Sequence, residues 1–446
     1  MNKIIKRFYL GLAALCLIFA VLVACAQVAW GQSPWVSKQL WVAMFAAAAS
    51  AVIAWKCKPA VALNLLAVLS SLLLIELGLQ AAGWLGLLPG VNTKIKTPHG
   101  RVYWSLEGLG NSVRNSFGWY YPEFNTTAAR KIALVGDSFV EAVEIHRHRN
   151  EGVILEQQMR AAGIDAAVLA FGIHGTSPAY HRDVIDYAAR HFHPDEVVLC
   201  IYLGNDVTES SPELNLMPPS KFIYYQHDGA GRLELHPESR ELRAQFVRGL
   251  EFSHHSPPFT LSATISSHVM SVQVLTSLRD TWSRRRAAAA RVSAESTDPV
   301  AVQIRATGLN PRAFRVPAES EVEQAVSVLL GTIGACRDTC TTNGMTMRLA
   351  LIPCFPQSFY ATQKGRDWTL RFAQYDFQAH ERRISAFARS NGIPVLELGQ
   401  YMKNKQLDVT EIQELYLSGG SGHFSEAGHR YFAGALCETF FPLPGK

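Results

Sequence analysis

The chain has 446 residues, of which 48% are hydrophobic and only 18% are charged. This is enough for one large or two smaller globular units with real cores, but the charged fraction is low for a wholly soluble protein. The net charge of +5 is modest, and the basic stretch at 284–291 has no interleaved aromatic residues, so we expect no nucleic-acid partner.

The hydrophobic residues are concentrated in the first 88 positions, in three segments that carry almost no charge. They cover about 9–30, 40–55 and 60–84, with Asn64 and Glu76 as the interruptions of the third. A helix needs about 20 apolar residues to cross a bilayer. Tryptophans also lie near the segment ends, as interfacial anchors do. The sequence therefore predicts that residues 1–88 form a transmembrane region and that the lipid bilayer is a partner.

The basic residues around these segments set the expected orientation. Most of them lie before the first segment or between the second and third: Lys3, Lys6, Arg7, Lys56 and Lys58. Only Lys38 lies between the first and second segments. The positive-inside rule then places residues 89–446 outside the cytoplasm. The stretch ending in Cys25 also resembles a lipoprotein cleavage box, and cleavage there would leave the same outward-facing domain.

Residues 89–130 have weak periodicity and are predicted to be a linker, whereas residues 131–446 alternate apolar strands with helices. The predicted strands are 131–136, 166–172, 196–204, 347–353 and 394–399. The predicted helices are 149–162, 178–191, 319–342, 372–391 and 425–439. This order predicts an α/β fold, a flavodoxin-like three-layer αβα sandwich with a parallel sheet of about five strands. We expect an insertion at 206–318, with a hairpin around Asp228-Gly229 and a helix near 264–290.

The first of these strands ends at Gly136-Asp137-Ser138, where a helix is expected to begin. Unpaired N–H groups and the helix dipole would stabilise negative charge near a serine hydroxyl there. Asp and Ser are also good helix N-caps, so these three residues alone allow a purely structural interpretation.

Two further stretches favour chemistry at the same edge of the sheet. Gly204-Asn205-Asp206 ends the third strand and supplies a side-chain amide. GHFSEAGH at 422–429 opens the last helix and supplies an imidazole. In an open parallel sheet, ligands bind beyond the carboxyl ends of the strands.

In this order, the serine, glycine, asparagine and histidine resemble the blocks of the SGNH (GDSL) hydrolase family. The matching stretches are VGDSFVEA at 135–142, FGIHGTSPA at 171–179, YLGNDV at 202–207 and GHFSEAGHRYFA at 422–433. RNSFGWYYPEF at 114–124 also resembles a stretch that precedes the serine in exported bacterial members. Those members carry an arginine two residues after the glycine, where this chain has Tyr120.

The resemblance implies a role for each matched position. Ser138 would be the nucleophile and His423 the general base. The N–H groups of Ser138 and Gly175 and the amide of Asn205 would form the oxyanion hole. Supporting positions would be Gly136, Asp137, Gly204, Asp206 and Ser421. The histidines at 191, 193, 254 and 255 lack metal-ligand spacing, so no metal or cofactor is predicted.

The sequence departs from the family at the acid that orients the histidine. Family members carry it two or three residues before the histidine, where this chain has Ser421 and Gly420. A backbone carbonyl could orient His423 instead, or Glu411 or Glu414 could fold in. The third alternative is impaired catalysis, since loss of this acid can cost about 10⁴ in rate.

The resemblance and the predicted topology together imply a multi-pass protein of the bacterial inner membrane with a periplasmic esterase domain. Its substrate would be an acylated carbohydrate or another ester, such as the O-acetyl groups of a cell-surface or secreted polysaccharide. An O-acyltransferase using the same serine, or a catalytically impaired polysaccharide-binding or assembly protein, are the alternatives. A membrane complex with polysaccharide machinery would fit either. Trp119, Tyr120 and Tyr121 could stack on sugar rings or pack against the domain.

Overall fold

The computed structural model describes most of the chain after residue 100 and one helix before it. The described residues are 59–84, 101–104, 108, 110–217, 221–254, 271, 274–275, 279, 299–306, 309–354, 357–358, 362, 374–417 and 422–442. The chain divides into two compact units, Met1–Ala81 and Ala82–Lys446.

Helix α3, Pro59–Trp84, covers the third apolar segment of the sequence. Its large apolar side chains that are more than half exposed are Val68, Leu72, Leu73, Leu74, Ile75 and Leu77. The predicted segments 9–30 and 40–55 lie outside the described residues. Within the part of the chain that the structure describes, no helix is both long and apolar enough to cross a membrane. The transmembrane region stays a prediction.

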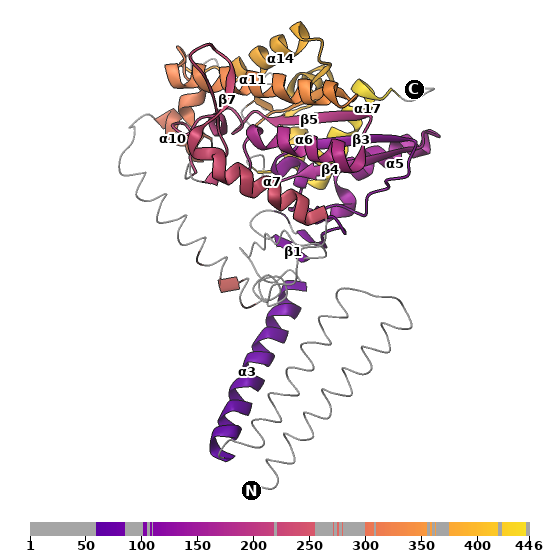
Figure 1. Ribbon diagram of the computed structural model, residues 1–446, viewed down its shortest axis with the longest axis vertical. Helices are drawn as coiled ribbons and strands as arrows, with labels where there is room; N and C mark the ends of the chain where they lie inside the picture. The colour runs from indigo at the N-terminus through magenta and orange to yellow at the C-terminus, as the bar shows by residue number, and fades with distance from the viewer. Residues whose placement is uncertain are drawn as a thin grey trace. The chain divides into compact units, whose positions relative to one another are not determined.

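A five-stranded parallel sheet forms the centre of the second unit. Its strands are β3 (Arg130–Gly136), β4 (Ala166–Gly172), β5 (Glu196–Tyr202), β8 (Thr346–Ile352) and β9 (Val395–Glu397). Figure 1 labels three of its strands, β3, β4 and β5. The five strands lie in the order β4-β3-β5-β8-β9, which is the flavodoxin-like 2-1-3-4-5 arrangement. The parallel pairing of neighbouring strands confirms the predicted α/β class and the parallel sheet. Runs such as Ala166–Gly172 are buried along their whole length, as expected for strands that are covered on both faces.

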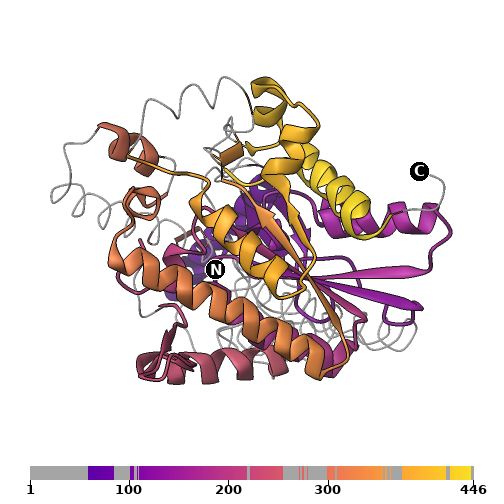
Figure 2. The same cartoon turned by 90° about the horizontal axis from the view of Figure 1, so that it is seen from above.

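Helices cover both faces of the sheet (Figure 2). One layer holds α6 (Pro178–Phe192), α11 (Ser320–Thr342) and α14 (Ala379–Ser390). The other holds α5 (Glu151–Ala161) and α17 (Glu426–Phe440), with α15 (Leu398–Asn404) beside α17.

Two polar side-chain contacts join α17 to the segment around α5. His429 Nδ1 lies 2.6 Å from Glu151 Oε2, and both side chains are buried. At the surface, Arg149 pairs with Glu426. These contacts position the start of α17, which directly follows the segment that carries His423.

The last predicted helix before β9 begins later than expected. The sequence indicated a helix over 372–391, but α14 starts at Ala379. Tyr375 instead forms an isolated β-bridge with Arg315, which keeps the chain extended at that point.

Residues 110–124 lie within the predicted linker but are packed into the domain. β2 (Gly110–Val113) pairs antiparallel with β1 (Arg101–Trp104). The Trp119 ring then contacts Phe171 edge-on at 5.1 Å. Trp119, Tyr120 and Tyr121 are at most 5% exposed, so their aromatic surface contributes to packing and is not presented to a ligand.

The described part of the predicted insertion contains a hairpin and a helix. β6 (Tyr225–His227) and β7 (Leu233–Leu235) pair antiparallel around the expected turn at 228–231. The predicted helix near 264–290 lies almost entirely outside the described residues.

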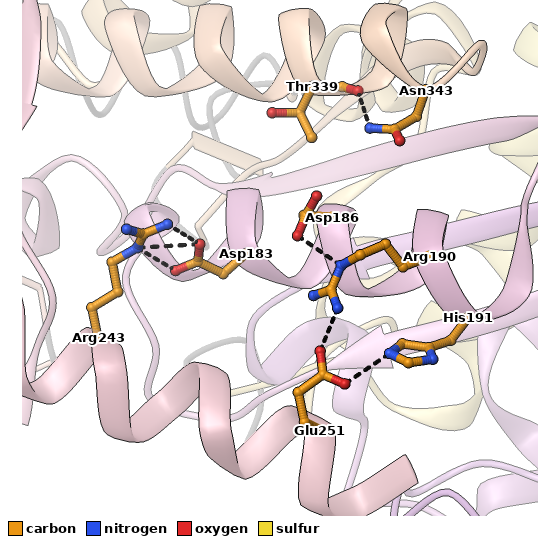
Figure 3. Close-up of polar contacts among 8 residues, drawn as sticks. All are labelled: Asp183, Asp186, Arg190, His191, Arg243, Glu251, Thr339 and Asn343. Carbon is orange, nitrogen blue, oxygen red and sulfur yellow. Dashed lines mark hydrogen bonds and ion pairs between the residues drawn. The ribbon is translucent and has the colours of Figure 1, made fainter.

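Helix α7 (Arg240–His254) lies along α6 and is joined to it by ion pairs (Figure 3). Arg243 Nη2 lies 2.6 Å from Asp183 Oδ1, and its Nε lies 2.8 Å from Asp183 Oδ2. Further along, Glu251 accepts from Arg190 at 2.5 Å and contacts His191 at 3.0 Å. The insertion is thus attached to one helical layer of the domain. At the end of α11, in the same layer, Asn343 Nδ2 donates to the Thr339 carbonyl (Figure 3).

Candidate active site

Ser138 lies directly after β3, where the chain turns sharply. Gly136 permits this turn, because a Cβ there would lie 2.6 Å from Val140 Cγ2 and 3.1 Å from Cys200 Cβ. Asp137 accepts from the backbone N–H of Phe139 at 3.0 Å and so caps the following turn. Residues 136–138 therefore both cap the following turn and position the Ser138 hydroxyl.

The helix that follows Ser138 is much shorter than the sequence suggested. Helix α4 contains only Ser138–Glu141, and Ala142 ends it with a left-handed φ of 52°. Because a helix dipole grows with the number of aligned peptides, four residues provide little of the expected electrostatic stabilisation. An oxyanion here would depend on individual N–H and amide donors.

His423 lies within hydrogen-bond distance of Ser138, although 285 positions separate them in the sequence. Its Nε2 is 2.8 Å from Ser138 Oγ. The segment around it is held by Phe424, which is 1% exposed and packs edge-on against Phe139 at 4.9 Å. The His423 carbonyl also accepts from the Leu417 N–H at 2.8 Å. The structure thus brings the predicted nucleophile and the predicted base together.

Glu144 places a carboxyl group beside His423, which the sequence did not reveal. Its Oε1 lies 3.2 Å from His423 Nδ1, on the side of the ring opposite Ser138, and its side chain is 0% exposed. A buried carboxylate at this distance can hold the imidazole in one orientation and stabilise its charged form. Serine, histidine and glutamate therefore form a continuous chain of contacts.

The acids proposed from the sequence have other positions. Glu411 belongs to a capping box at the start of α16 (Val409–Glu414), where its carboxylate accepts from the Asp408 N–H at 2.8 Å. Glu414 is exposed, and its backbone carbonyl accepts from the Ser425 hydroxyl. Residues 420 and 421 lie outside the described residues, so the expected supporting role of Ser421 stays a prediction.

The sequence around Glu144 gives only an indirect signal of its role. Its neighbours Val143 and Ile145 are apolar and buried, at 3% and 4% exposure. A glutamate that is buried between two such residues needs a charged or hydrogen-bonding partner. The residues that meet it come from distant loops, so the partner was not visible in the sequence.

The loop after β4 is fixed against α4. A Cβ at Gly172 would lie 1.9 Å from the backbone nitrogen of Glu141, so the two segments approach as closely as glycine allows. Glu141 accepts from the His174 N–H at 2.7 Å and forms a buried ion pair of 2.7 Å with Arg114. Gly175, with φ 68°, follows directly. Its N–H stays the predicted oxyanion donor.

Asn205 and Asp206 follow β5, the neighbour of β3 in the sheet. Asp206 Oδ2 accepts from the Tyr202 N–H at 2.8 Å and holds the turn. A Cβ at Gly204 would lie 2.5 Å from the Tyr202 ring. Asn205 Nδ2 donates to Glu209 Oε1 at 3.0 Å, which orients the amide and leaves its second hydrogen for the predicted oxyanion hole.

Burial raises the pKa of three carboxyl groups beneath this edge. Burial raises the pKa of Glu209 to about 8, and the charge of Asp137 adds to the effect. Burial also raises the pKa of Asp137 to about 6, although the Phe139 N–H and His423 oppose the shift. The pKa of Asp206 is raised well above its ordinary value, first by burial and then by Asp137 and Glu209.

Comparison with known proteins gives structural similarity only. No family model matches the chain, and no curated protein matches it. The crystal structure of TesA is 12% identical, with a TM-score of 0.34, over 70% of this chain and 99% of that one. A lipolytic protein of the G-D-S-L family from Veillonella parvula DSM 2008 is 11% identical, with a TM-score of 0.33, over 71% and 100%.

A third similar structure is the acetyl xylan esterase AlAXEase. It is 11% identical, with a TM-score of 0.33, over 70% of this chain and 99% of that one. The functional interpretation of this chain rests on the geometry of its own site.

Proposed function

We propose that this protein is a serine ester hydrolase with Ser138 as nucleophile, His423 as general base and Glu144 as the acid. The observation that carries the proposal is the unbroken series of contacts from Ser138 Oγ to His423 Nε2, at 2.8 Å, and from His423 Nδ1 to Glu144, at 3.2 Å. A nucleophile within hydrogen-bond reach of a base that is itself oriented by a third group is the arrangement that activates a hydroxyl.

The reaction would proceed in two halves. Ser138 Oγ attacks the ester carbonyl while His423 Nε2 takes its proton, and the resulting imidazolium is stabilised by Glu144. The oxyanion would accept hydrogen bonds from the Ser138 and Gly175 N–H groups and from Asn205. The imidazolium then protonates the leaving alcohol, and an acyl-serine remains. Water activated by His423 releases the acid and restores the serine.

The proposed substrates are acyl esters, such as the O-acetyl groups of a cell-surface or secreted polysaccharide. Support for this class comes from the three apolar segments and the distribution of basic residues, which favour a periplasmic domain on a bacterial inner-membrane protein. A membrane complex with the machinery that handles the polymer belongs to the same proposal. The contact of Glu144 with His423 favours catalysis over a binding or assembly role, because it supplies the acid missing beside the histidine.

Hydrolysis of p-nitrophenyl acetate by the full chain in detergent tests the proposal. We expect measurable turnover, reduction to the background rate in Ser138→Ala, and retained turnover in Ser390→Ala, which removes an exposed serine hydroxyl at the end of α14. Equal rates in the native protein and Ser138→Ala would contradict the proposal.

An O-acyltransferase that uses the same serine has a distinct signature in this assay. A rapid burst of p-nitrophenol followed by slow turnover would indicate that the acyl-serine forms and waits for an acceptor. Added polyol or oligosaccharide would then accelerate turnover, whereas in a hydrolase it would leave the rate nearly unchanged.

A further inference from the structure

His174 lies beside the proposed triad and faces the same carboxylate as His423. Its Nδ1 is 3.9 Å from Glu144 Oε1, and its ring centroid is 5.5 Å from that of His423. One ligand atom from each of Glu144, His174 and His423 lies within 4.8 Å of the other two. The proposed hydrolysis uses only two of these three side chains.

We propose that these three side chains bind a divalent transition metal ion, such as Zn²⁺, and that the bound ion reversibly inhibits the enzyme. The inhibitory effect rests on the proposed function, whereas binding of the ion does not. Two imidazole nitrogens and one carboxylate oxygen are a ligand set that suits Zn²⁺. Mg²⁺ and Ca²⁺ prefer sites built from oxygen ligands.

The spacing of the ligand atoms fits this ion after a small adjustment. Zn²⁺ binds nitrogen and carboxylate oxygen at about 2.0–2.2 Å, so tetrahedral ligands lie about 3.4 Å apart. Glu144 Oε1 lies 3.2 Å from His423 Nδ1 and 3.9 Å from His174 Nδ1. The His174 ligand atom lies within 4.8 Å of those of Glu144 and His423, so movement of the His174 ring toward both would complete the set around one ion.

The ion could enter from solvent and would find a negatively charged ligand. The side chains of His174 and His423 are 19% and 18% exposed, whereas Glu144 is fully buried behind them. The nearby Arg114 is paired with Glu141, so its charge is largely neutralised. The His174 N–H donates to the Glu141 carboxylate at 2.7 Å. This hydrogen bond fixes the loop that carries His174, the third proposed ligand.

The position of the protons explains why metal binding would stop catalysis. In the active form, His423 carries a proton on Nδ1 toward Glu144 and leaves Nε2 free to accept the serine proton. An ion on Nδ1 occupies that nitrogen, and the single proton of the neutral ring moves to Nε2. The nitrogen that must accept a proton from Ser138 then already carries one, and the carboxylate that would stabilise the imidazolium is bound to the metal.

Binding can be measured without any activity. Co²⁺ in a tetrahedral site has strong visible absorption, whereas Zn²⁺ is spectroscopically silent. We expect Ser138→Ala, as full chain in detergent, to bind one equivalent of Co²⁺ with these bands and to release it to Zn²⁺. Adding His174→Gln or His174→Phe should remove the bands, and using both variants keeps the test valid if one fails to fold.

His148→Gln is the matched control, because His146 and His148 form an exposed pair with ring centroids 5.3 Å apart that could bind a metal at the surface. We expect this variant to keep the Co²⁺ bands. Bands that persist without His174, or that vanish without His148, would overturn the proposed site.

Inhibition is measured on the active protein, with each variant compared with its own metal-free rate. We expect Zn²⁺ to inhibit ester hydrolysis and excess EDTA to restore it. Removal of His174 should raise the Zn²⁺ concentration for half-inhibition by at least about 10–100-fold, the loss typical of perturbing even an outer-shell partner. His148→Gln should leave this concentration unchanged.

Two results would overturn the inhibitory role. Zn²⁺ sensitivity that is unchanged without His174 would place the inhibiting ion elsewhere. Stimulation by Zn²⁺, or inactivation by EDTA, would make the ion part of the chemistry. Failure of the proposed function is distinguishable from both, because hydrolysis would then be absent while Co²⁺ binding would still report on the site.

Discussion

Replacement of Glu144 by glutamine tests the most specific claim about the site. The substitution keeps the shape of the side chain and removes its negative charge. In the native protein this charge lies 3.2 Å from His423 Nδ1 and is fully shielded from solvent. The imidazolium that forms while Ser138 attacks would lose this neighbouring charge, whereas the ground state with neutral His423 would lose much less.

The expected size of the effect follows from the distance. Two unit charges about 3.2 Å apart attract by about 5 kcal/mol at an effective dielectric constant of 20. Since about 1.4 kcal/mol corresponds to a tenfold change in rate, kcat should fall by about 10³–10⁴. This agrees with the loss of about 10⁴ typical of removing the acid from a triad.

The assay is p-nitrophenyl acetate hydrolysis together with a thermal melt of each protein. Glu411→Gln and Glu414→Gln are the controls, because the sequence proposed these acids and the structure assigns them to α16. We expect both to retain activity within about twofold, in line with the small effects of most surface substitutions. The reasoning would be refuted by a folded Glu144→Gln protein that keeps more than a tenth of native kcat, or by a large loss in Glu411→Gln.

Two further predictions concern stability. Burial holds the pKa of Glu209 at about 8 against an ordinary 4.5, so the native protein should lose stability as pH rises from about 4.5 to about 8. In Glu209→Gln, the free energy of unfolding should fall by about 3–5 kcal/mol less over this pH range, as measured by denaturant unfolding at a series of pH values. The same pH dependence of the unfolding free energy in both proteins would contradict this prediction. Glu141→Gln leaves the buried Arg114 guanidinium without its ion pair and should cost about 3–5 kcal/mol in urea unfolding. Glu426→Gln breaks an exposed pair with Arg149 and should cost at most about 1 kcal/mol; similar losses in both variants would show that burial does not set the cost.

The sheet could be predicted from the sequence because its signal is local. Runs such as Ala166–Gly172 are apolar throughout, and only a strand covered on both faces needs that. Ser138 and His423 were identifiable because the residues around them form recognisable blocks. The rule that carboxyl ends of parallel strands share one edge predicted that Ser138 and Asn205 lie at the same edge, whereas the pairing of Ser138 with His423 was expected from the resemblance alone.

Glu144 could not be assigned in the same way, because its role depends on backbone geometry that the sequence does not display. The chain reverses at Ala142, in a left-handed conformation that alanine rarely adopts. This turn directs the following residues back toward the serine. Packing of the aromatic residues of 110–124 against the domain was one of the expected alternatives, but the partners could not be identified. The ring of Trp119 contacts Phe171 across a long sequence separation, and no local periodicity indicates such a contact.

The proposed nucleophile Ser138 and the proposed acid Glu144 both lie in the short stretch 138–144, whereas His423 comes from far along the chain. Correct assembly of the three groups therefore depends on a single distant docking event, that of the segment leading into α17. A ligand or partner that displaced this one segment by a few ångströms would inactivate Ser138 without contacting it. Such a displacement would have to break the buried contact between His429 and Glu151.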